Sequence, residues 1–161
     1  MAQPPDFNAA VAALGAVERL DVAAMRLLYR VERAGESFYN GVADRIGDPR
    51  AAELLRRNGR EERGHAERVR RAIGIKLGQA FDPSAEDLAP YPVPLPPTIP
   101  VAIFPQIVQA ELDGDVGYQR WADREDDPEV QRLLRLNGRE EMVHGDRVRQ
   151  VIAILSRQSP A

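Results

Sequence analysis

The chain has 161 residues, of which 43% are hydrophobic and 29% charged, with a net charge of −3. These values predict one soluble globular domain over residues 1–161, with a core large enough to fold unaided. The absence of cysteine excludes disulfides, thiolate metal sites and iron–sulfur clusters. The acidic balance argues against nucleic-acid binding. The chain has no apolar run of about 20 residues for a membrane span and no signal peptide, so we expect a cytoplasmic protein.

The first predicted element is a short N-terminal helix within residues 7–20, which we expect to pack at one end of the fold. Residues 22–46 show apolar positions at spacings of three and four, which predicts a second helix. A break follows, in which Asp48 is suited to cap a new helix and Pro49 to occupy its first position. The same spacing predicts that this third helix covers residues 49–77.

Residues 78–100 hold seven of the 13 prolines and therefore predict an extended connection. At ~3.1 Å per residue this segment reaches about 70 Å. The preceding helix of roughly 29 residues is about 43 Å long. The connection can therefore run the full length of a bundle, which predicts a long Pro-rich crossover between two helical hairpins, residues 21–77 and 101–156. No segment shows the alternation typical of strands, so the expected fold class is all-α.

The two predicted hairpins are related by an internal repeat. Shifting the sequence by 79 residues aligns Glu32–Ile75 with Glu111–Ile154, and 22 of the 44 positions are identical. Asn58-Gly59 and its repeat Asn137-Gly138 favour turns by propensity, but the apolar spacing continues through both pairs. We therefore expect unbroken helices there, with the glycines marking close packing or a local bulge.

Six ionisable residues occupy helix positions where apolar core residues are expected: Glu32, Glu62, His65, Glu111, Glu141 and His144. Unpartnered carboxylates in a core cost several kcal/mol each or become protonated. No Lys or Arg shares these positions, so metal is the expected counter-charge, with four carboxylates balancing two divalent ions. The alternative is a bundle that lacks metal and keeps these residues as a polar network.

The pattern resembles the ferritin-like superfamily, and most closely its rubrerythrin branch, over residues 21–156. The motifs that carry the resemblance are a Glu followed seven residues later by a Tyr, and a Glu-Glu-x-x-His sequence, each present twice: Glu32 with Tyr39, Glu111 with Tyr118, Glu61-Glu62-Arg-Gly-His65 and Glu140-Glu141-Met-Val-His144. The resemblance implies a four-helix bundle in which Glu62 and Glu141 bridge two metal ions and the other four of the six residues are terminal ligands. Such oxygen and imidazole ligands suit iron or manganese, with zinc as a further occupant.

The resemblance implies a non-haem di-iron or di-manganese protein that oxidises Fe(II) and reduces O₂ or peroxide. The alternatives are iron binding and storage, or a di-iron oxygenase or manganese catalase with another substrate. Rubrerythrins carry an additional ligand Glu where this chain has Gly114, which is a departure from the peroxide-reducing members. Without cysteine the chain lacks a rubredoxin module, so we expect an external electron donor. We also expect a homodimer, because closed two-fold dimers are the commonest assemblies.

Three further pairs of residues flank the predicted ligands: Glu36 and Asp115, Glu61 and Glu140, and Tyr39 and Tyr118. The first pair is predicted to supply extra ligands or hydrogen-bond acceptors, or else solvated acids at the mouth of the site. The second pair either orients the histidine of the opposite half through its second N–H or is solvated. The tyrosines are redox-active or hydrogen-bonding groups beside the metals, or core packing.

Overall fold

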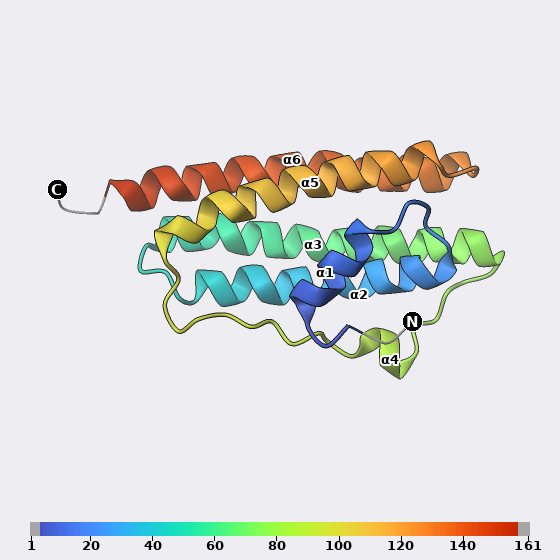
Figure 1. Cartoon of the computed structure of the whole chain (residues 1–161), viewed down its shortest axis with the longest axis horizontal. Helices are drawn as coiled ribbons and strands as arrows, with labels where there is room; N and C mark the ends of the chain where they lie inside the picture. Colours follow the sequence, from blue (N-terminus) through green and yellow to red (C-terminus); the bar gives the residue numbers. More distant parts are fainter. Residues whose placement is uncertain (1–3, 158–161) are drawn as a thin grey trace.

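The computed structural model describes residues 4–157, which form helices and loops with no strand in that range (Figure 1). Four long helices make up the body of the molecule: α2 (Val22–Ala43), α3 (Pro49–Leu77), α5 (Phe104–Asp123) and α6 (Pro128–Ser156). Three short elements accompany them: α1 (Phe7–Gly15), α4 (Ala85–Leu88) and a 3₁₀ turn at Val101–Ile103. The predicted all-α class is confirmed. Within residues 4–157, none of the helices combines the length and apolar character that a membrane span requires.

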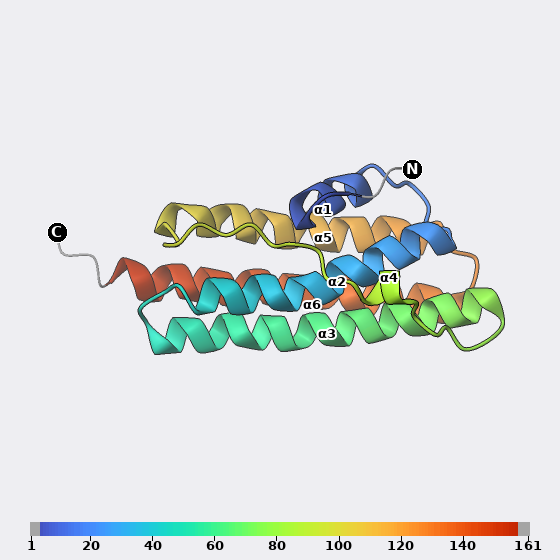
Figure 2. The same ribbon diagram turned by 90° about the horizontal axis from the view of Figure 1, so that it is seen from below.

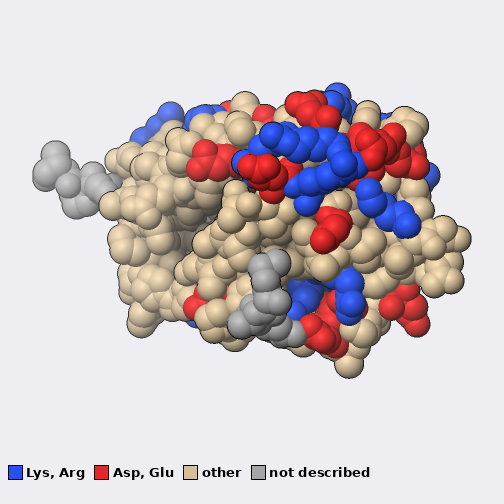
Figure 3. All heavy atoms as spheres, turned by 45° about the vertical axis from the view of Figure 1, so that its right-hand side comes forward, with Lys and Arg blue, Asp and Glu red and all other residues tan. Residues whose placement is uncertain are grey.

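The long helices pack as two pairs, α2 with α3 and α5 with α6 (Figures 1 and 2). The pairs contact each other mainly through α3 and α6. The helical bundle expected from the apolar spacing is therefore present in the structure. On the face that Figure 3 shows, basic and acidic side chains lie interspersed, without a large area of one sign.

The starts of α3 and α6 follow from the same local chemistry. The Asp48 carboxylate accepts hydrogen bonds from two backbone N–H groups of the first turn, and Pro49 occupies the first helical position. Asp127 and Pro128 do the same for α6. Such a cap contributes about 1 kcal/mol, because it satisfies donors that the helix itself leaves free. The predicted start of the second helix in the first hairpin is confirmed.

Both Asn-Gly pairs lie inside unbroken helices, as predicted. The reason is close packing between the helices of each hairpin. A Cβ atom on Gly138 would lie 2.8 Å from Asp115 Oδ1 and 3.0 Å from Tyr118 Cβ, and one on Gly59 would lie 3.3 Å from Tyr39 Cβ. The absence of a side chain at these two positions lets the helices approach each other.

Residues 78–100 connect the two hairpins and run from one end of the bundle to the other (Figure 1). Residues 90–100 are non-helical, as their prolines predict. The prediction did not include α4, which forms because Ser84 and Asp87 cap its single turn reciprocally. Asp87 also accepts a 2.8 Å hydrogen bond from Arg26, which attaches the connection to α2.

The prediction that the N-terminal helix packs at one end of the fold is wrong. The helix α1 ends at Gly15 and lies along the side of α2, where Ala10 packs near Ala34 and Phe7 stacks on Phe38 at 5.6 Å between ring centroids. The Phe7 N–H also donates a 3.0 Å hydrogen bond to the Pro92 carbonyl, so the connection holds α1 at this position. The end of the bundle is covered by the following loop, whose Val17 carbonyl accepts a 2.7 Å hydrogen bond from Trp121 Nε1.

Two apolar clusters fill the two ends of the bundle. The first contains the side chains near the start of α2 and the end of α3, with their neighbours on α5 and α6: Met25, Leu28, Tyr29, Ile73, Trp121 and Leu133 among others. The second contains those at the opposite ends of the same helices: Val42, Leu55, Phe104, Val148 and Val151 among others. Full burial of such a side chain contributes about 1.5–3 kcal/mol. The clusters therefore offset the cost of a buried polar layer between them.

Candidate metal centre

That polar layer is made of side chains from all four long helices, at the middle of each. Glu and His three residues apart share one face of a helix, so α3 and α6 each present one of each to the bundle interior. All six predicted ligands are at most 9% exposed: Glu32 from α2, Glu62 and His65 from α3, Glu111 from α5, and Glu141 and His144 from α6. The structure thus brings together the six residues that the sequence singles out.

The six residues form two overlapping groups, and in each group one potential ligand atom per residue lies within 4.8 Å of all the others. The first, which we call the Glu32 group, consists of Glu32, Glu62, His65 and Glu141. The second, which we call the Glu111 group, consists of Glu62, Glu111, Glu141 and His144. Both groups contain Glu62 and Glu141, which we call the shared carboxylates. Each group also has its own terminal carboxylate and imidazole.

The shared carboxylates each direct one oxygen to each group. Glu62 Oε2 lies 3.5 Å from His65 Nδ1, and its Oε1 lies 3.2 Å from His144 Nδ1. Glu141 Oε1 lies 3.3 Å from His65 Nδ1, and its Oε2 lies 3.3 Å from His144 Nδ1. This is the arrangement in which a carboxylate can bridge two cations, with one oxygen on each.

The two Nδ1 atoms are buried and have no hydrogen-bond partner. Each is nonetheless surrounded by carboxylate oxygens at 3.2–3.5 Å, including Glu32 Oε2 at 3.4 Å from His65 and Glu111 Oε2 at 3.5 Å from His144. An ion with bonds of about 2.1 Å separates its ligand atoms by about 3.0–3.4 Å in octahedral or tetrahedral geometry. An orphaned nitrogen at that distance from oxygens fits a metal ligand, so these residues can hold metal ions.

Burial and the mutual repulsion of the carboxylates raise pKa values in the polar layer. Burial, reinforced by the Glu141 carboxylate, raises the pKa of Glu111 to about 8. The same causes raise the pKa of Glu62 well above its usual range. Burial opposes charge on His144, but the surrounding carboxylates outweigh it and raise the pKa to about 12. Without metal, Glu62, Glu111 and His144 therefore hold their protons more tightly than free groups do.

Two glycines make room for the shared carboxylates. A Cβ atom on Gly35 would lie 3.1 Å from Glu62 Cδ and 3.2 Å from its Oε2. The repeat-related Gly114 faces Glu141, with a Cβ position 3.4 Å from Glu141 Cγ. The Glu141 side chain, from the neighbouring helix α6, thus lies against the backbone at position 114.

We expect Gly35→Ala to weaken metal binding about tenfold or more while leaving the metal-free protein at least as stable as the native one. The added methyl displaces the Glu62 carboxylate by a few tenths of an ångström, and displacements around metal ligands cost about 10–100-fold in affinity. Alanine also gains up to ~1 kcal/mol over glycine inside a helix. Isothermal titration with Mn(II) and thermal melting measure the two effects.

Gly64→Ala is the matched control, because its Cβ would meet only Arg68 Nη1 at 3.9 Å, an ordinary contact. It should stabilise the helix without changing metal affinity. Native affinity in Gly35→Ala would contradict the placement of Glu62 as a ligand.

The outer nitrogens of the histidines face acids of the opposite hairpin. His65 Nε2 lies 3.0 Å from Glu140 Oε2, and His144 Nε2 lies 3.2 Å from Glu61 Oε2. An N–H at Nε2 that donates to the carboxylate leaves the Nδ1 lone pair directed at the group. Glu140 and Glu61 therefore lie where they can orient the histidines, and their side chains are about one-third exposed to solvent.

The tyrosines hydrogen-bond to the terminal carboxylates of the opposite hairpin. The Tyr118 hydroxyl donates to Glu32 Oε1, and the Tyr39 hydroxyl donates to Glu111 Oε1. Both rings are buried, and burial followed by the nearby carboxylates raises the pKa of each hydroxyl well above its usual range. The tyrosines are therefore held as neutral donors beside the two groups.

The first flanking pair lies outside both groups. Glu36 forms an ion pair with Arg63 at 3.0 Å, and Asp115 accepts a 2.9 Å hydrogen bond from Gln119 Nε2. Both acids are half-buried, and neither belongs to a group of potential ligand atoms in residues 4–157. The structure thus favours their assignment as partly solvated acids at the edge of the site.

Two arginines close to the site were missed by the sequence reasoning. Arg147 is 7% exposed and donates to both carboxylate oxygens of Glu61, and Arg68 donates to one carboxylate oxygen of Glu140. They lie one turn beyond the histidines and outside the apolar positions of their helices, so the apolar spacing does not single them out. Their identity in both copies of the repeat is the signal that could have found them.

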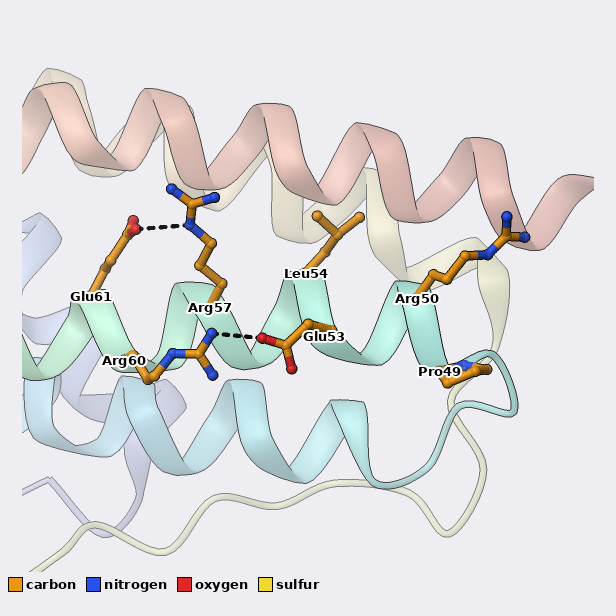
Figure 4. Close-up of a pocket in the computed structure, with 7 residues that line it drawn as sticks. All are labelled: Pro49, Arg50, Glu53, Leu54, Arg57, Arg60 and Glu61. Atoms are coloured by element: carbon orange, nitrogen blue, oxygen red, sulfur yellow. Dashed lines mark hydrogen bonds and ion pairs between the residues drawn. The ribbon is translucent and has the colours of Figure 1, made fainter.

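The hollows on the surface lie outside the centre. One of about 860 Å³ is lined by side chains of α3 alone (Figure 4), and these are Pro49, Arg50, Glu53, Leu54, Arg57, Arg60 and Glu61. Its charged groups pair with one another, as Arg60 does with Glu53 at 2.7 Å and Arg57 with Glu61 at 3.3 Å. Only Glu61 connects this hollow with the polar layer.

Comparison of the chain with family models, with curated proteins and with solved structures gives no match. The function therefore has to be inferred from the chemistry of the polar layer itself.

Proposed function

We propose that the chain is a ferritin-like protein of the rubrerythrin type, which oxidises Fe(II) and reduces O₂ or peroxide at a carboxylate-bridged dinuclear centre. The observation that carries this proposal is the position of Glu62 and Glu141, each of which has one oxygen near each histidine. Bundles of this class draw one Glu from each of two helices and Glu-x-x-His from each of the other two. The four long helices supply that set.

The donor set supports iron or manganese as the resident metal. Four carboxylates and two imidazoles, with no sulfur, suit these ions, and zinc is a further occupant. A pair of iron ions supplies electrons for the reduction of O₂ or peroxide when bound. Since the chain has no cysteine, the electrons for repeated turnover come from an external donor under this proposal.

The chain's own residues hold the ions and exclude water. The apolar clusters at both ends of the bundle close the layer to solvent along the bundle axis. The tyrosine hydroxyls donate to Glu32 Oε1 and Glu111 Oε1, which leaves the other oxygen of each carboxylate, Oε2, facing a histidine Nδ1. Each terminal ligand is thereby oriented before an ion binds.

Protein loaded with Fe(II) without oxygen should oxidise that iron rapidly when O₂ or H₂O₂ is added. The rate can be followed in a stopped-flow spectrometer against Fe(II) in buffer. Glu62→Ala should bring the rate to that of buffer, because the shared carboxylate serves both ions. Glu36→Gln is the control, because Glu36 pairs with Arg63 outside both groups, and it should leave the rate near the native one. Native protein that oxidises iron no faster than buffer would reject the proposed activity.

The proposal includes a homodimer, which light scattering can test. A dimer mass at micromolar concentration is the expected result. A monomer mass would contradict this part of the proposal, and the mass of a large cage would favour iron storage instead.

A further inference from the structure

Arg68 is connected to the terminal imidazole of the Glu32 group through one side chain. Its Nη2 donates to Glu140 Oε2, and the same oxygen lies 3.0 Å from His65 Nε2. Arg68 and His65 belong to α3 and Glu140 belongs to α6. The hydrogen-bonded path from Arg68 to His65 therefore passes through the opposite hairpin.

Arg68 is also connected to the terminal carboxylate of the same group. Its Nε donates to Asn137 Oδ1, and Asn137 Nδ2 donates a 3.0 Å hydrogen bond to the Tyr118 hydroxyl. That hydroxyl donates to Glu32 Oε1. The Arg68 guanidinium is thus linked to His65 and Glu32, the two residues of the Glu32 group that are not part of the Glu111 group.

Arg147 is connected to the terminal imidazole of the Glu111 group, His144, in the same way. It donates to Glu61 at 2.6 and 3.0 Å, and Glu61 faces His144 Nε2. It also donates to Asn58 Oδ1 at 3.0 Å. Asn58 Nδ2 in turn donates a 3.2 Å hydrogen bond to the backbone carbonyl of His144.

We propose that Arg68 and Arg147 are positioning residues, each of which orients the terminal imidazole of one metal ion, and that Arg68 also orients the terminal carboxylate Glu32. The inference rests on the proposed dinuclear function. Arginine suits this role because its rigid fork has five donors and keeps its charge, so it can hold a carboxylate and an amide at once. Lysine offers a single charged point and cannot keep both arms in one geometry.

An ordinary cross-helix ion pair lies one turn away on the same interface. Arg71 of α3 pairs with Glu129 of α6 at 2.7 Å, but its side chain is 63% exposed and contacts neither group. Such exposed pairs contribute little to stability. Arg71 is therefore a matched control for the loss of an arginine that bridges α3 and α6.

The test uses protein with a single ion, so that the two groups can be told apart. His144→Ala removes a ligand of the Glu111 group and should leave one Co(II) ion in the Glu32 group. In that background we expect Arg68→Gln to weaken Co(II) binding about 10–100-fold. In the same background, the affinity for Co(II) should stay close to that of His144→Ala alone when Arg147→Gln or Arg71→Gln is added. In a His65→Ala background the single ion occupies the Glu111 group, and Arg147→Gln rather than Arg68→Gln should weaken its binding.

A second readout separates positioning from general destabilisation. Zn(II)-loaded protein is diamagnetic and has two histidines, so NMR should show two Nε2–H protons that exchange slowly. Arg68→Gln should speed the exchange of the His65 proton alone, and Arg147→Gln that of the His144 proton alone. Arg68→Lys, which keeps the charge, should have a smaller effect of the same kind and covers the case in which Arg68→Gln fails to fold.

The outcomes distinguish the two proposals. Native protein that binds no Co(II) would overturn the proposed function and this inference with it. The arginine assignment alone would be overturned under two conditions together. The native protein binds two ions, and Arg68→Gln and Arg147→Gln reduce the Co(II) affinity equally, or not at all, in each single-ion background.

Discussion

Glu62→Ala and Glu141→Ala should each release both metal ions, whereas Glu32→Ala and Glu111→Ala should each release one. The reason is the position of the carboxylate oxygens. Both shared residues place one oxygen beside each histidine Nδ1, while Glu32 lies beside His65 alone and Glu111 beside His144 alone. Elemental analysis of protein dialysed against metal-free buffer should give almost no metal for the first two variants and about half the native content for the others.

Glu36→Ala provides the control, because Glu36 is a half-buried acid one turn from Glu32 that belongs to neither group. Its metal content should equal that of the native protein. Full occupancy in Glu62→Ala would reject the bridging role, and complete loss in Glu32→Ala would show that the two groups do not bind independently.

Metal-free protein should melt earlier than metal-loaded protein, and the difference should grow between pH 5 and pH 8. Metal that binds only the folded state at 100 times its dissociation constant stabilises it by about 2.7 kcal/mol. For a chain of this size that corresponds to about 5–11 °C in Tm. Differential scanning calorimetry of both forms at several pH values measures the difference.

The direction of the pH dependence follows from the raised pKa values in the metal-free layer. Glu111, with its pKa raised from 4.5 to about 8 by burial, contributes stability below pH 4.5 that is lost as the pH rises to 8. His144, with its pKa raised from 6.5 to about 12 because carboxylates outweigh burial, contributes stability below pH 6.5 that is lost above it. Both groups weaken the metal-free fold as the pH rises. Metal binding strengthens at the same time, because ligands must lose their protons.

Glu62→Gln isolates this cause, because it removes a carboxyl whose pKa is raised well above its usual range by burial and by Glu141. The metal-free variant should lose less stability than the metal-free native protein over the same range. Equal melting temperatures of native metal-free and metal-loaded protein from pH 5 to pH 8 would show that the buried acids do not depend on metal.

The helices and the six central residues were predictable because both depend on local spacing. Asp48 and Pro49 mark a helix start through their own backbone chemistry, and apolar spacing carries α3 through Asn58-Gly59. Acidic side chains such as Glu32 at core positions are costly, so their pattern points to the layer they form. These signals lie within single helices and do not require knowledge of how the helices pack.

The remaining features depend on contacts between distant segments. The position of α1 is determined by Phe38 and Pro92, which the sequence does not place beside Phe7. Arg68 looks like one more surface arginine until α6 brings Asn137 and Glu140 against it. Periodicity shows which face of a helix is buried, but it does not show which residue of another helix lies opposite.

The contacts around the two groups are reciprocal: each half of the chain orients ligands that the other half supplies, as Tyr118 does for Glu32 and Tyr39 for Glu111. Two chains that exchanged their second hairpins would therefore recreate every one of these contacts, with each centre shared between two molecules. The extended residues 89–100 are the segment that would have to open for such an exchange. Domain swapping would then conserve the metal content per chain while doubling the mass, and shortening this segment would change the balance between the closed and exchanged forms.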